Sequence, residues 1–172
     1  MDNHSIRELS ESDWAEYKAI RLRSLQDSAD SFGSTYERES KFQTEQWKAR
    51  LRVSPPIHDA VVLAAVVGDT YVGLLSCVIQ RPATRRAHLN QMWVAPEYRG
   101  CGIGVALVKK ARKWAYKRNI GNLLLSVVTV NAAAISLYQN NGFKPIGVTE
   151  LLRPGSSLES QIMEAKLNEN DS

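Results

Sequence analysis

The stretch that decides the fold is Val94-Ala95-Pro96-Glu97-Tyr98-Arg99-Gly100-Cys101-Gly102-Ile103-Gly104. An apolar run ends at Val94, glycines alternate from Gly100 to Gly104, and apolar residues at three- and four-residue steps then indicate a helix. Unpaired backbone N–H groups and the positive end of the helix dipole therefore point at one spot. Glycine lets a pyrophosphate approach the main chain, and Arg99 adds positive charge. The stretch predicts a phosphate site, with a tight ligand-free turn as the alternative.

Two other nucleotide motifs fail on the same residues. A P-loop requires Gly-Lys-Ser/Thr, but Gly104 is followed by Val105-Ala106. A dinucleotide fingerprint that starts at Gly100 needs a small residue where Val105 stands. Neither class of nucleotide site is therefore expected here.

Strands are expected on both sides of this segment. Residues 60–67 and 70–79 are rich in β-branched residues, and Gly68-Asp69 between them predicts an antiparallel hairpin. A third strand is expected at 88–94, after a polar loop that contains Arg81. The nearly continuous apolar run at 123–130 predicts a strand that is buried on both faces, as in a parallel pair.

The remaining elements complete a mixed sheet. A helix is expected at 131–141, ended by Gly142 in a left-handed conformation, with final strands at 143–148 and 160–167. At the other end, a strand at 5–9 precedes a helix that starts in an Asp13-Trp14-Ala15-Glu16 capping box. Residues 31–39 interrupt the helical pattern, which resumes at 44–51 with Thr44 as its cap. The prediction is one domain, residues 1–172, with helices packed on a mixed α/β sheet.

Composition excludes several classes of protein. Of 172 residues, 44% are apolar and 23% charged, which is typical of a soluble globular protein with a single core. No leader-like start and no long apolar run is present, so neither secretion nor membrane spanning is expected. Cys77 and Cys101 lack paired spacing, which favours a reducing, cytoplasmic compartment.

Charge and histidine patterns add little chemistry. The net charge of +4 is below that of a dedicated nucleic-acid binder. The basic residues of the helix after Gly104 lie opposite its apolar stripe, and we interpret them as a solvated face: Lys109, Lys110, Arg112, Lys113, Lys117 and Arg118. A nucleic-acid binder that uses this helix is the weaker alternative. His4, His58 and His88 have no metal-ligand spacing, so no metal is expected.

Two motifs together resemble one family. Arg99-x-x-Gly102-x-Gly104, between a strand and a helix, resembles the acyl-CoA-binding motif of the GNAT superfamily of N-acyltransferases. Downstream, Asn131 at a strand end and Tyr138, four residues before Gly142-Phe143, resemble the same family's second signature. The resemblance implies a central, mostly antiparallel sheet with a splayed parallel strand pair and helices on both faces.

The resemblance also implies an activity and a set of donor-binding residues. The implied reaction is direct transfer of an acetyl group from acetyl-CoA to a primary amine of a small molecule or a protein, in a ternary complex. The pantetheine arm is then expected on the backbone near Met92, Trp93 and Val94, where a free N–H stabilises the oxyanion. The pyrophosphate is expected on Arg99 and the amides of Gly100, Cys101, Gly102, Ile103 and Gly104.

The second motif supplies the remaining implied roles. Asn131 is expected to bond the pantetheine amides, and Tyr138 to protonate the departing thiolate. A strand glutamate that many relatives use as a base is absent from 88–94. His88, Glu37, Glu39 or water stay open as the base. Because of that gap, a catalytically silent acyl-CoA sensor is the alternative function. The acceptor and the oligomeric state stay open, although the C-terminal strand offers an edge for a homodimer.

Overall fold

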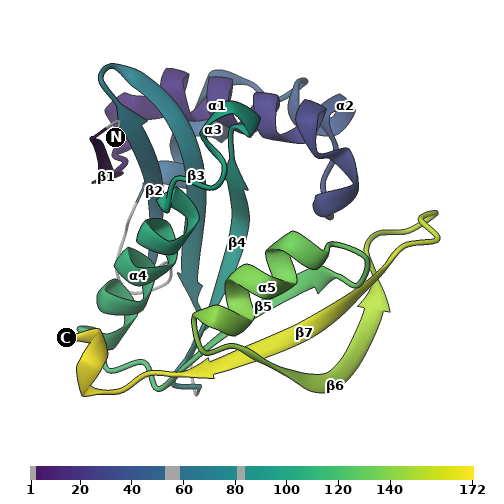
Figure 1. Cartoon of the computed structure of the whole chain (residues 1–172). Coiled ribbons are helices and arrows are strands. Elements are labelled where there is room, and N and C mark those ends of the chain that lie inside the picture. The colour runs from purple at the N-terminus through teal and green to yellow at the C-terminus, as the bar shows by residue number, and fades with distance from the viewer. Residues whose placement is uncertain (1–2, 53–58, 81–83) are drawn as a thin grey trace.

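The computed structural model describes residues 3–52, 59–80 and 84–172, and these form a seven-stranded sheet in the order β1-β2-β3-β4-β5-β7-β6 (Figure 1). The strands are β1 His4–Glu8, β2 Ala60–Val67, β3 Thr70–Ile79, β4 Arg86–Val94, β5 Asn122–Val128, β6 Lys144–Leu151 and β7 Glu159–Lys166. The α-helices are α1 Trp14–Asp27, α2 Tyr36–Glu39, α3 Thr44–Leu51, α4 Ile103–Tyr116 and α5 Ala132–Asn140. The mixed α/β sheet expected from the sequence is confirmed. His58 and Arg81 lie outside the described residues.

The strand predictions are confirmed, with ends that differ by at most three residues. β2 and β3 pair antiparallel on either side of a turn in which Gly68 has a φ of 58°. β5 pairs parallel with β4 and antiparallel with β7. Its apolar run is explained by this central position, because side chains such as Leu124 and Leu125 are buried on its two faces, whereas Ser126 is exposed.

β4 and β5 stay together over only half of their length. Their parallel register runs from Arg86↔Asn122 to Leu89↔Leu125 and then stops. Beyond Leu89 and Leu125 the two strands diverge, and we call the gap between them the fork (Figure 1). The sheet is thereby divided into an arm of β1 to β4 and an arm of β5, β7 and β6.

A β-bulge in β4 lies at the start of the fork. Asn90 pairs with Ser76 and Trp93 with Leu74, so Gln91 and Met92 together lie opposite a single residue of β3. Gln91 has a φ of 61°, a left-handed conformation that is uncommon for a residue other than glycine. An extra residue bends a strand and increases its local twist. The bulge therefore turns the end of β4 away from β5.

Helices cover both faces of the sheet. α4 and α5 lie on one face, and α1 to α3 lie on the other (Figure 1). We call these the α5 face and the α1 face. Because side chains alternate along β5, Leu125 faces α5 whereas Ser126 faces the α1 side. On the α1 face, Tyr17 and Trp47 are fully buried and their rings meet edge to face at 5.6 Å.

Two helix caps differ from the sequence prediction. Asp13 makes no cap bond to α1; its Oδ2 accepts a hydrogen bond from the backbone N–H of Ser10 at 2.7 Å. A short 3-10 turn, Glu11–Asp13, precedes α1, and its own capping box uses the Asp13 carboxylate first. At α3, Gln43 is the N-cap and forms a capping box with Gln46, so Thr44 is the first helical residue.

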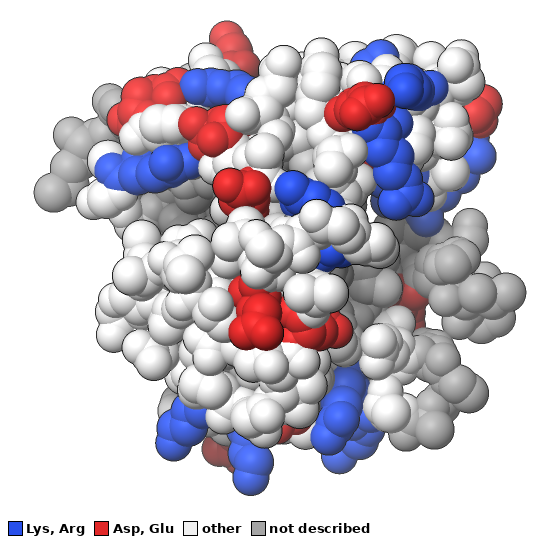
Figure 2. Space-filling view, turned by 90° about the vertical axis from the view of Figure 1, so that its right-hand side faces the viewer, with Lys and Arg blue, Asp and Glu red and all other residues white. Residues whose placement is uncertain are grey.

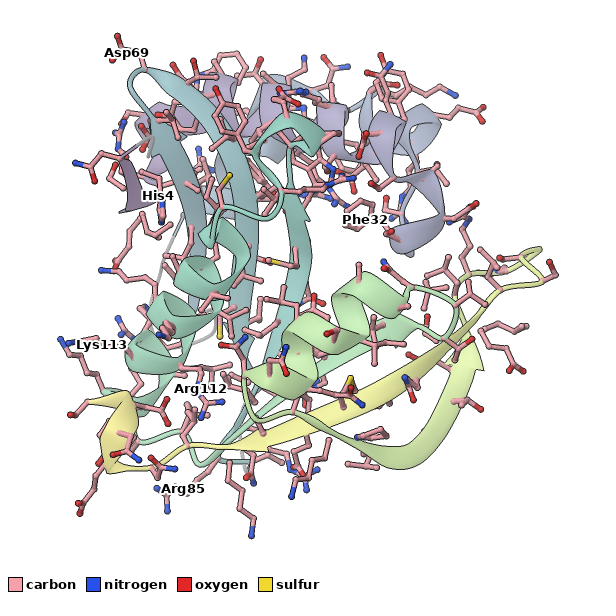
Figure 3. The ribbon with its side chains drawn as sticks, in the orientation of Figure 1. His4, Phe32, Asp69, Arg85, Arg112 and Lys113 are labelled. Atoms are coloured by element: carbon pink, nitrogen blue, oxygen red, sulfur yellow. The ribbon has the colours of Figure 1, made fainter. Side chains whose placement is uncertain are left out.

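The interpretation of the α4 basic residues is wrong for Arg112. Its side chain is only 13% exposed. Its Nε and Nη2 atoms donate to the Asp171 carboxylate at 2.6 and 3.0 Å, and its Nη1 atom donates to the carbonyl of Asn141. Figure 3 shows the contrast with Lys113, which points outward. Arg112 therefore joins α4 to the C-terminal turn and to the end of α5.

Candidate functional site

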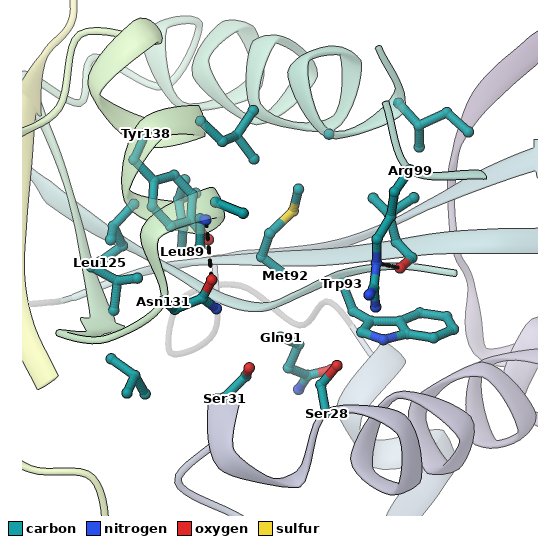
Figure 4. A pocket seen from close by; sticks show the side chains of 18 of the residues that line it. Ser28, Ser31, Leu89, Gln91, Met92, Trp93, Arg99, Leu125, Asn131 and Tyr138 are labelled. Atoms are coloured by element: carbon teal, nitrogen blue, oxygen red, sulfur yellow. Dashed lines mark hydrogen bonds between the residues drawn. The ribbon is translucent and has the colours of Figure 1, made fainter. Parts of the chain in front are cut away.

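A cavity of about 550 Å³ occupies the fork. Its walls come from the ends of β4 and β5, the glycine segment, α5, and the residues that follow α1. Figure 4 shows Tyr138 on one side of the cavity and Ser28, Ser31 and Gln91 on the other. The cavity therefore reaches from the α5 face to the α1 face through the opening between the strands.

Most of the residues singled out in the sequence meet at this cavity. Those among its lining are Met92, Trp93, Val94, Arg99, Gly100, Gly102, Ile103, Gly104, Asn131 and Tyr138. Cys101 is not among the lining residues; its exposed thiol lies 3.8 Å from the carbonyl oxygen of Arg99. Two segments almost thirty residues apart thus converge on one space, and the individual roles of their residues stay predictions.

The glycine segment is shaped for a ligand that contacts the main chain. Gly100 and Gly102 have φ values of 78° and 80°, and a Cβ atom at either would meet nothing within 4 Å. Gly102 is the N-cap of α4, whose first N–H groups have no partner within the helix. Gly104 serves packing instead, because its Cβ would come within 3.1 Å of Leu137 and Met92.

Arg99 is less free than the sequence suggests. Its Nε atom donates to the carbonyl of Val94 at 2.9 Å, and its Nη2 atom donates to Asp27 at 2.7 Å. Asp27 also accepts from Trp93 Nε1 at 2.9 Å. Burial opposes its ionisation, but these hydrogen bonds outweigh burial and lower the pKa of the Asp27 carboxyl. Arg99 therefore shares its charge with a residue at the end of α1 while it lines the cavity.

The edge of β4 that faces the cavity is open to a ligand. Trp93 and Val94 pair with β3 on one side. On the other side, the register with β5 ends at Leu89, so none of the strands in the described part of the chain pairs with residues 90–94 there. Across the cavity, Asn131 caps α5 by accepting a hydrogen bond from the backbone N–H of Ala134 at 3.2 Å. The capping oxygen is occupied, whereas the amide nitrogen of Asn131 is available to a ligand.

Tyr138 presents a protonated phenol to the cavity. The residue is 6% exposed, and its ring packs edge to face against Phe143 at 5.8 Å. No hydrogen bond to its hydroxyl is found among the described residues. Burial raises the pKa of Tyr138 well above its ordinary value, because the phenolate form is poorly solvated there. The side chain is thus a neutral proton donor at physiological pH.

The sequence left three side chains open as the base, and the structure removes Glu39. Its side chain is 1% exposed, and its carboxylate accepts from Arg21 at 2.9 and 3.1 Å and from Arg50 at 2.9 Å. Burial acts to raise the pKa of Glu39, but the bonds and charge of Arg21, supported by Arg50, lower it to about 2. Glu39 is a structural anchor of the α1 face.

The other two side chains do not line the cavity. Glu37 is an exposed residue of α2 whose carboxylate lies 3.7 Å from the ammonium of Lys41. His88 lies on β4 before the fork and is half-buried. Burial, followed by the charge of Arg86, lowers the pKa of His88, and the charge of Glu150 opposes them. The imidazole is therefore neutral near pH 7.

Three residues near the cavity were missed in the sequence. Ser126 interrupts an otherwise apolar strand, which was a usable signal, and it is exposed on the cavity wall. Asp27 and Glu150 gave no local signal. They reach the site through contacts with Arg99 and Ser126, respectively, which lie far from them in the chain.

Two kinds of feature are absent from residues 3–52, 59–80 and 84–172. Within these ranges, no three His, Cys, Asp or Glu side chains gather in a way that suits a metal ion. The helices of the same ranges are all too short or too polar to cross a membrane.

Comparisons with known proteins agree on one family. The model of the acetyltransferase (GNAT) family matches residues 13–143. Over 103 residues the chain is 33% identical to a streptothricin acetyltransferase from Streptomyces lavendulae, covering 60% of this chain and 54% of that protein. The chain thus covers about half of the length of that relative.

Solved structures share the fold over nearly the whole chain. An acetyltransferase of the GNAT family from Streptococcus pneumoniae superposes with a TM-score of 0.80 at 23% identity, covering 96% of this chain and all of that one. The PaiA N-acetyltransferase of Thermoplasma acidophilum, solved in complex with coenzyme A, gives 0.74 at 26% identity, covering 95% and 99%. The splayed strand pair and the helices on both faces are therefore a shared architecture.

Proposed function

The chain belongs to the acetyltransferase (GNAT) family, and on that premise we propose that it transfers an acetyl group from acetyl-CoA to a primary amine. Transfer is direct, within a ternary complex. The observation that carries the proposal is the cavity in the fork, which opens to both faces of the sheet. A donor and an acceptor can thereby enter from opposite sides and meet between β4 and β5.

The residues of the α5 face fit a coenzyme A molecule. The open space above Gly100 and Gly102 and the free N–H groups at the start of α4 suit a pyrophosphate. The unpaired edge of β4 at 90–94 suits the amide-bearing pantetheine arm, with Asn131 across the cavity. When bound, acetyl-CoA supplies the activated acetyl thioester.

Tyr138 is the proposed acid. Proton donation by a positioned side chain contributes about 10²- to 10⁴-fold in rate. The Tyr138 phenol is held protonated by burial and lacks a hydrogen-bond partner of its own among the described residues, so it is available to the departing sulfur. Backbone N–H groups of the bulge at Gln91 and Met92, which together lie opposite a single residue of β3, are the proposed stabilisers of negative charge on the acetyl oxygen.

The acceptor class is a primary amine of a small molecule or of a peptide. Streptothricin is one compound to test because the Streptomyces relative is named for it. Polyamines, amino acids and peptide amino termini are the other chemical classes. The walls after α1, with Ser28, Ser31 and Phe32, border the side on which we place the acceptor.

The experiment is a calorimetric titration of acetyl-CoA, followed by a thiol-release assay of the same sample. The panel is streptothricin, spermidine, lysine and a peptide with a free α-amino group. Micromolar binding with amine-dependent thiol release is expected. Binding without release across the panel would favour the sensor alternative, and no binding would contradict the donor site.

Three further properties complete the proposal. We propose that residues 1–172 act as one domain and work in the cytoplasm, which suits the two free cysteines. We also propose a homodimer through β6, an edge strand whose residues are all exposed and include Ile146, Val148 and Leu151 at 45–60%. Analytical ultracentrifugation tests the dimer; a monomer at all concentrations would contradict it.

A further inference from the structure

An amine acceptor must lose a proton before it can attack the thioester. An alkyl amine with a pKa near that of lysine, ~10.4, is an ammonium ion at pH 7 and has no lone pair for attack. Among the described residues that line the cavity there is no carboxylate and no histidine. A side chain that acts as the base therefore has to lie just behind the cavity wall.

Two carboxylates, those of Asp27 and Glu150, lie behind the cavity wall and accept hydrogen bonds from side chains that line it. Asp27 accepts from Ser28, Trp93 and Arg99, at 2.7 to 2.9 Å. It is already paired with a cation and lies beside the glycine segment. Glu150 accepts from Ser126 Oγ at 3.4 Å. No ion pair to Glu150 is found among the described residues.

The sheet register places Glu150 on the correct face. Glu150 pairs with Ser160, and Ser160 pairs with Val128, so these side chains lie on one face of the sheet. Ser126, two residues before Val128, shares that face. It is the α1 face, on which the acceptor is proposed to enter.

Ser126 also stands at the correct height along the strands. It is the first residue of β5 beyond the last parallel pair, Leu89↔Leu125. Asn90 holds the equivalent place on β4, and both side chains line the cavity. The Glu150 carboxylate thus contacts a side chain that lines the cavity at the point where β4 and β5 separate, which we call the mouth of the fork.

The surroundings favour a cation at this point. Burial lowers the pKa of His88 on β4, so this imidazole adds no positive charge to oppose the Glu150 carboxylate near pH 7. Arg86 lies 3.8 Å from Glu164 on β7. Figure 2 views the side where the β6–β7 hairpin ends and shows a few acidic side chains in a largely uncharged middle of that surface, with basic side chains above and below them. An exposed carboxylate such as that of Glu150 attracts an ammonium group.

We propose that Glu150, presented by Ser126 at the mouth of the fork, is the general base that receives the acceptor's ammonium group and takes its proton. The inference rests on the proposed function. It completes an arrangement in which the base stands on the α1 face and the acid, Tyr138, on the α5 face. It also accounts for the absence of a glutamate from residues 88–94, because β6 supplies the carboxylate that β4 lacks.

The acetyl transfer conserves atoms and charge. One ammonium N–H bond breaks, and its proton passes to the Glu150 carboxylate and then to solvent. The freed lone pair forms the N–C bond of the amide while the C–S bond of the thioester breaks. The nitrogen loses a second proton to solvent, and the sulfur takes one from Tyr138, which is reprotonated by solvent. One proton is released in total.

The test compares Glu150→Gln with Glu159→Gln. Glu159 pairs with Leu151, one position along the hairpin, so its side chain lies on the opposite face of the sheet and is the matched control. With the amine of the streptothricin, spermidine, lysine and peptide panel that the wild type acetylates fastest, kcat/KM of Glu150→Gln is expected to fall about 100-fold. The control and the calorimetric affinity for coenzyme A are expected to stay within about 2-fold of wild type, a difference of ~0.4 kcal/mol.

A second variant separates chemistry from structure. Because Glu150 is exposed, added propionate is expected to restore part of the activity of Glu150→Ala, which a purely structural role would not allow. Equal activity of wild type and Glu150→Gln would overturn the inference, as would a loss shared by Glu159→Gln or no rescue by propionate. A wild type that acetylates nothing in the panel would instead contradict the proposed function.

Discussion

The site uses different kinds of chemical group on the α5 face and on the α1 face of the sheet. On the α5 face, the cavity is lined by main-chain groups and glycines of the segment before α4, by Arg99, and by Asn131, the N-cap of α5, and Tyr138 within that helix. On the α1 face, it is organised by charged side chains, the buried Arg21–Glu39–Arg50 cluster and the Glu150–Ser126 contact. Under the proposed function, the difference means that donor recognition depends on backbone shape, whereas the proposed acceptor side depends on ion pairs and hydrogen bonds between distant segments.

The largest effect should come from the buried cluster of the α1 face. Glu39→Gln leaves the guanidinium of Arg21, which is 4% exposed, without its charge partner. Removing one partner of a buried pair costs about 3–5 kcal/mol of unfolding free energy. Urea denaturation measures this. Glu37→Gln, at an exposed ion pair on the same helix, is expected to change stability by less than ~0.5 kcal/mol and serves as control.

The same carboxyl predicts a pH dependence. The pKa of Glu39 is about 2 in the folded chain, below the ordinary 4.5, so folding favours the ionised form. Its contribution to stability is present above pH 4.5 and is lost as the pH falls toward 2. Urea denaturation of the wild type across this window should show a steeper loss than that of Glu39→Gln. Parallel curves would contradict the assigned pKa.

Next in size is the effect at Tyr138, the proposed acid of the α5 face. Tyr138→Phe is expected to lower kcat about 100-fold, since a positioned proton donor contributes at least that much. Its hydroxyl has no hydrogen-bond partner in the described part of the chain, so stability and the affinity for acetyl-CoA should barely change. Thiol release and calorimetry measure the two quantities. A fall in affinity with unchanged kcat would assign Tyr138 to binding alone.

A pair of glycines tests whether backbone shape serves the donor. Gly102 and Gly155 have φ values of 80° and 81°, and each has open space where a Cβ would lie. Alanine at either position is expected to cost about 1–2 kcal/mol of stability through the same strain. Only Gly102→Ala should also weaken acetyl-CoA binding, by about 10-fold or ~1.4 kcal/mol. Equal affinities of the two variants would remove the glycine segment from the donor site.

The smallest effect concerns a link across the acceptor side. Arg153, at the β6–β7 connection, donates to the carbonyls of Ala29 and Phe32 at 3.1 and 2.7 Å. Arg153→Ala is expected to cost about 1 kcal/mol of stability. It should raise the acceptor KM about 3-fold, or ~0.7 kcal/mol, and leave the KM for acetyl-CoA unchanged. A larger change in the KM for acetyl-CoA than in the acceptor KM would contradict the division of roles between the two faces.

The same division explains what could be predicted from the sequence. The α5 face lies in contiguous segments, so local patterns identified the glycine turn and the helix that carries Tyr138. On the α1 face, Ser126 and Glu150 are 24 residues apart and meet only through strand register. Glu39 looked like a candidate base because its partners Arg21 and Arg50 lie on other helices.

Smaller errors have the same physical origin. Asp13 had the sequence of a cap for α1, but the turn before the helix uses its carboxylate. Arg112 matched a solvated face, but the C-terminal turn folds over it and supplies Asp171. In each case a local pattern was correct about geometry, and a contact from elsewhere in the chain decided the partner.

The most direct test of the central claim is steady-state thiol release with both substrates varied against each other. Direct transfer between a donor on the α5 face and an acceptor on the α1 face predicts intersecting double-reciprocal lines and no thiol release without amine. Parallel lines would indicate an acyl-enzyme, and thiol release that does not depend on the amine would show that no acceptor is bound. Either result would contradict the account.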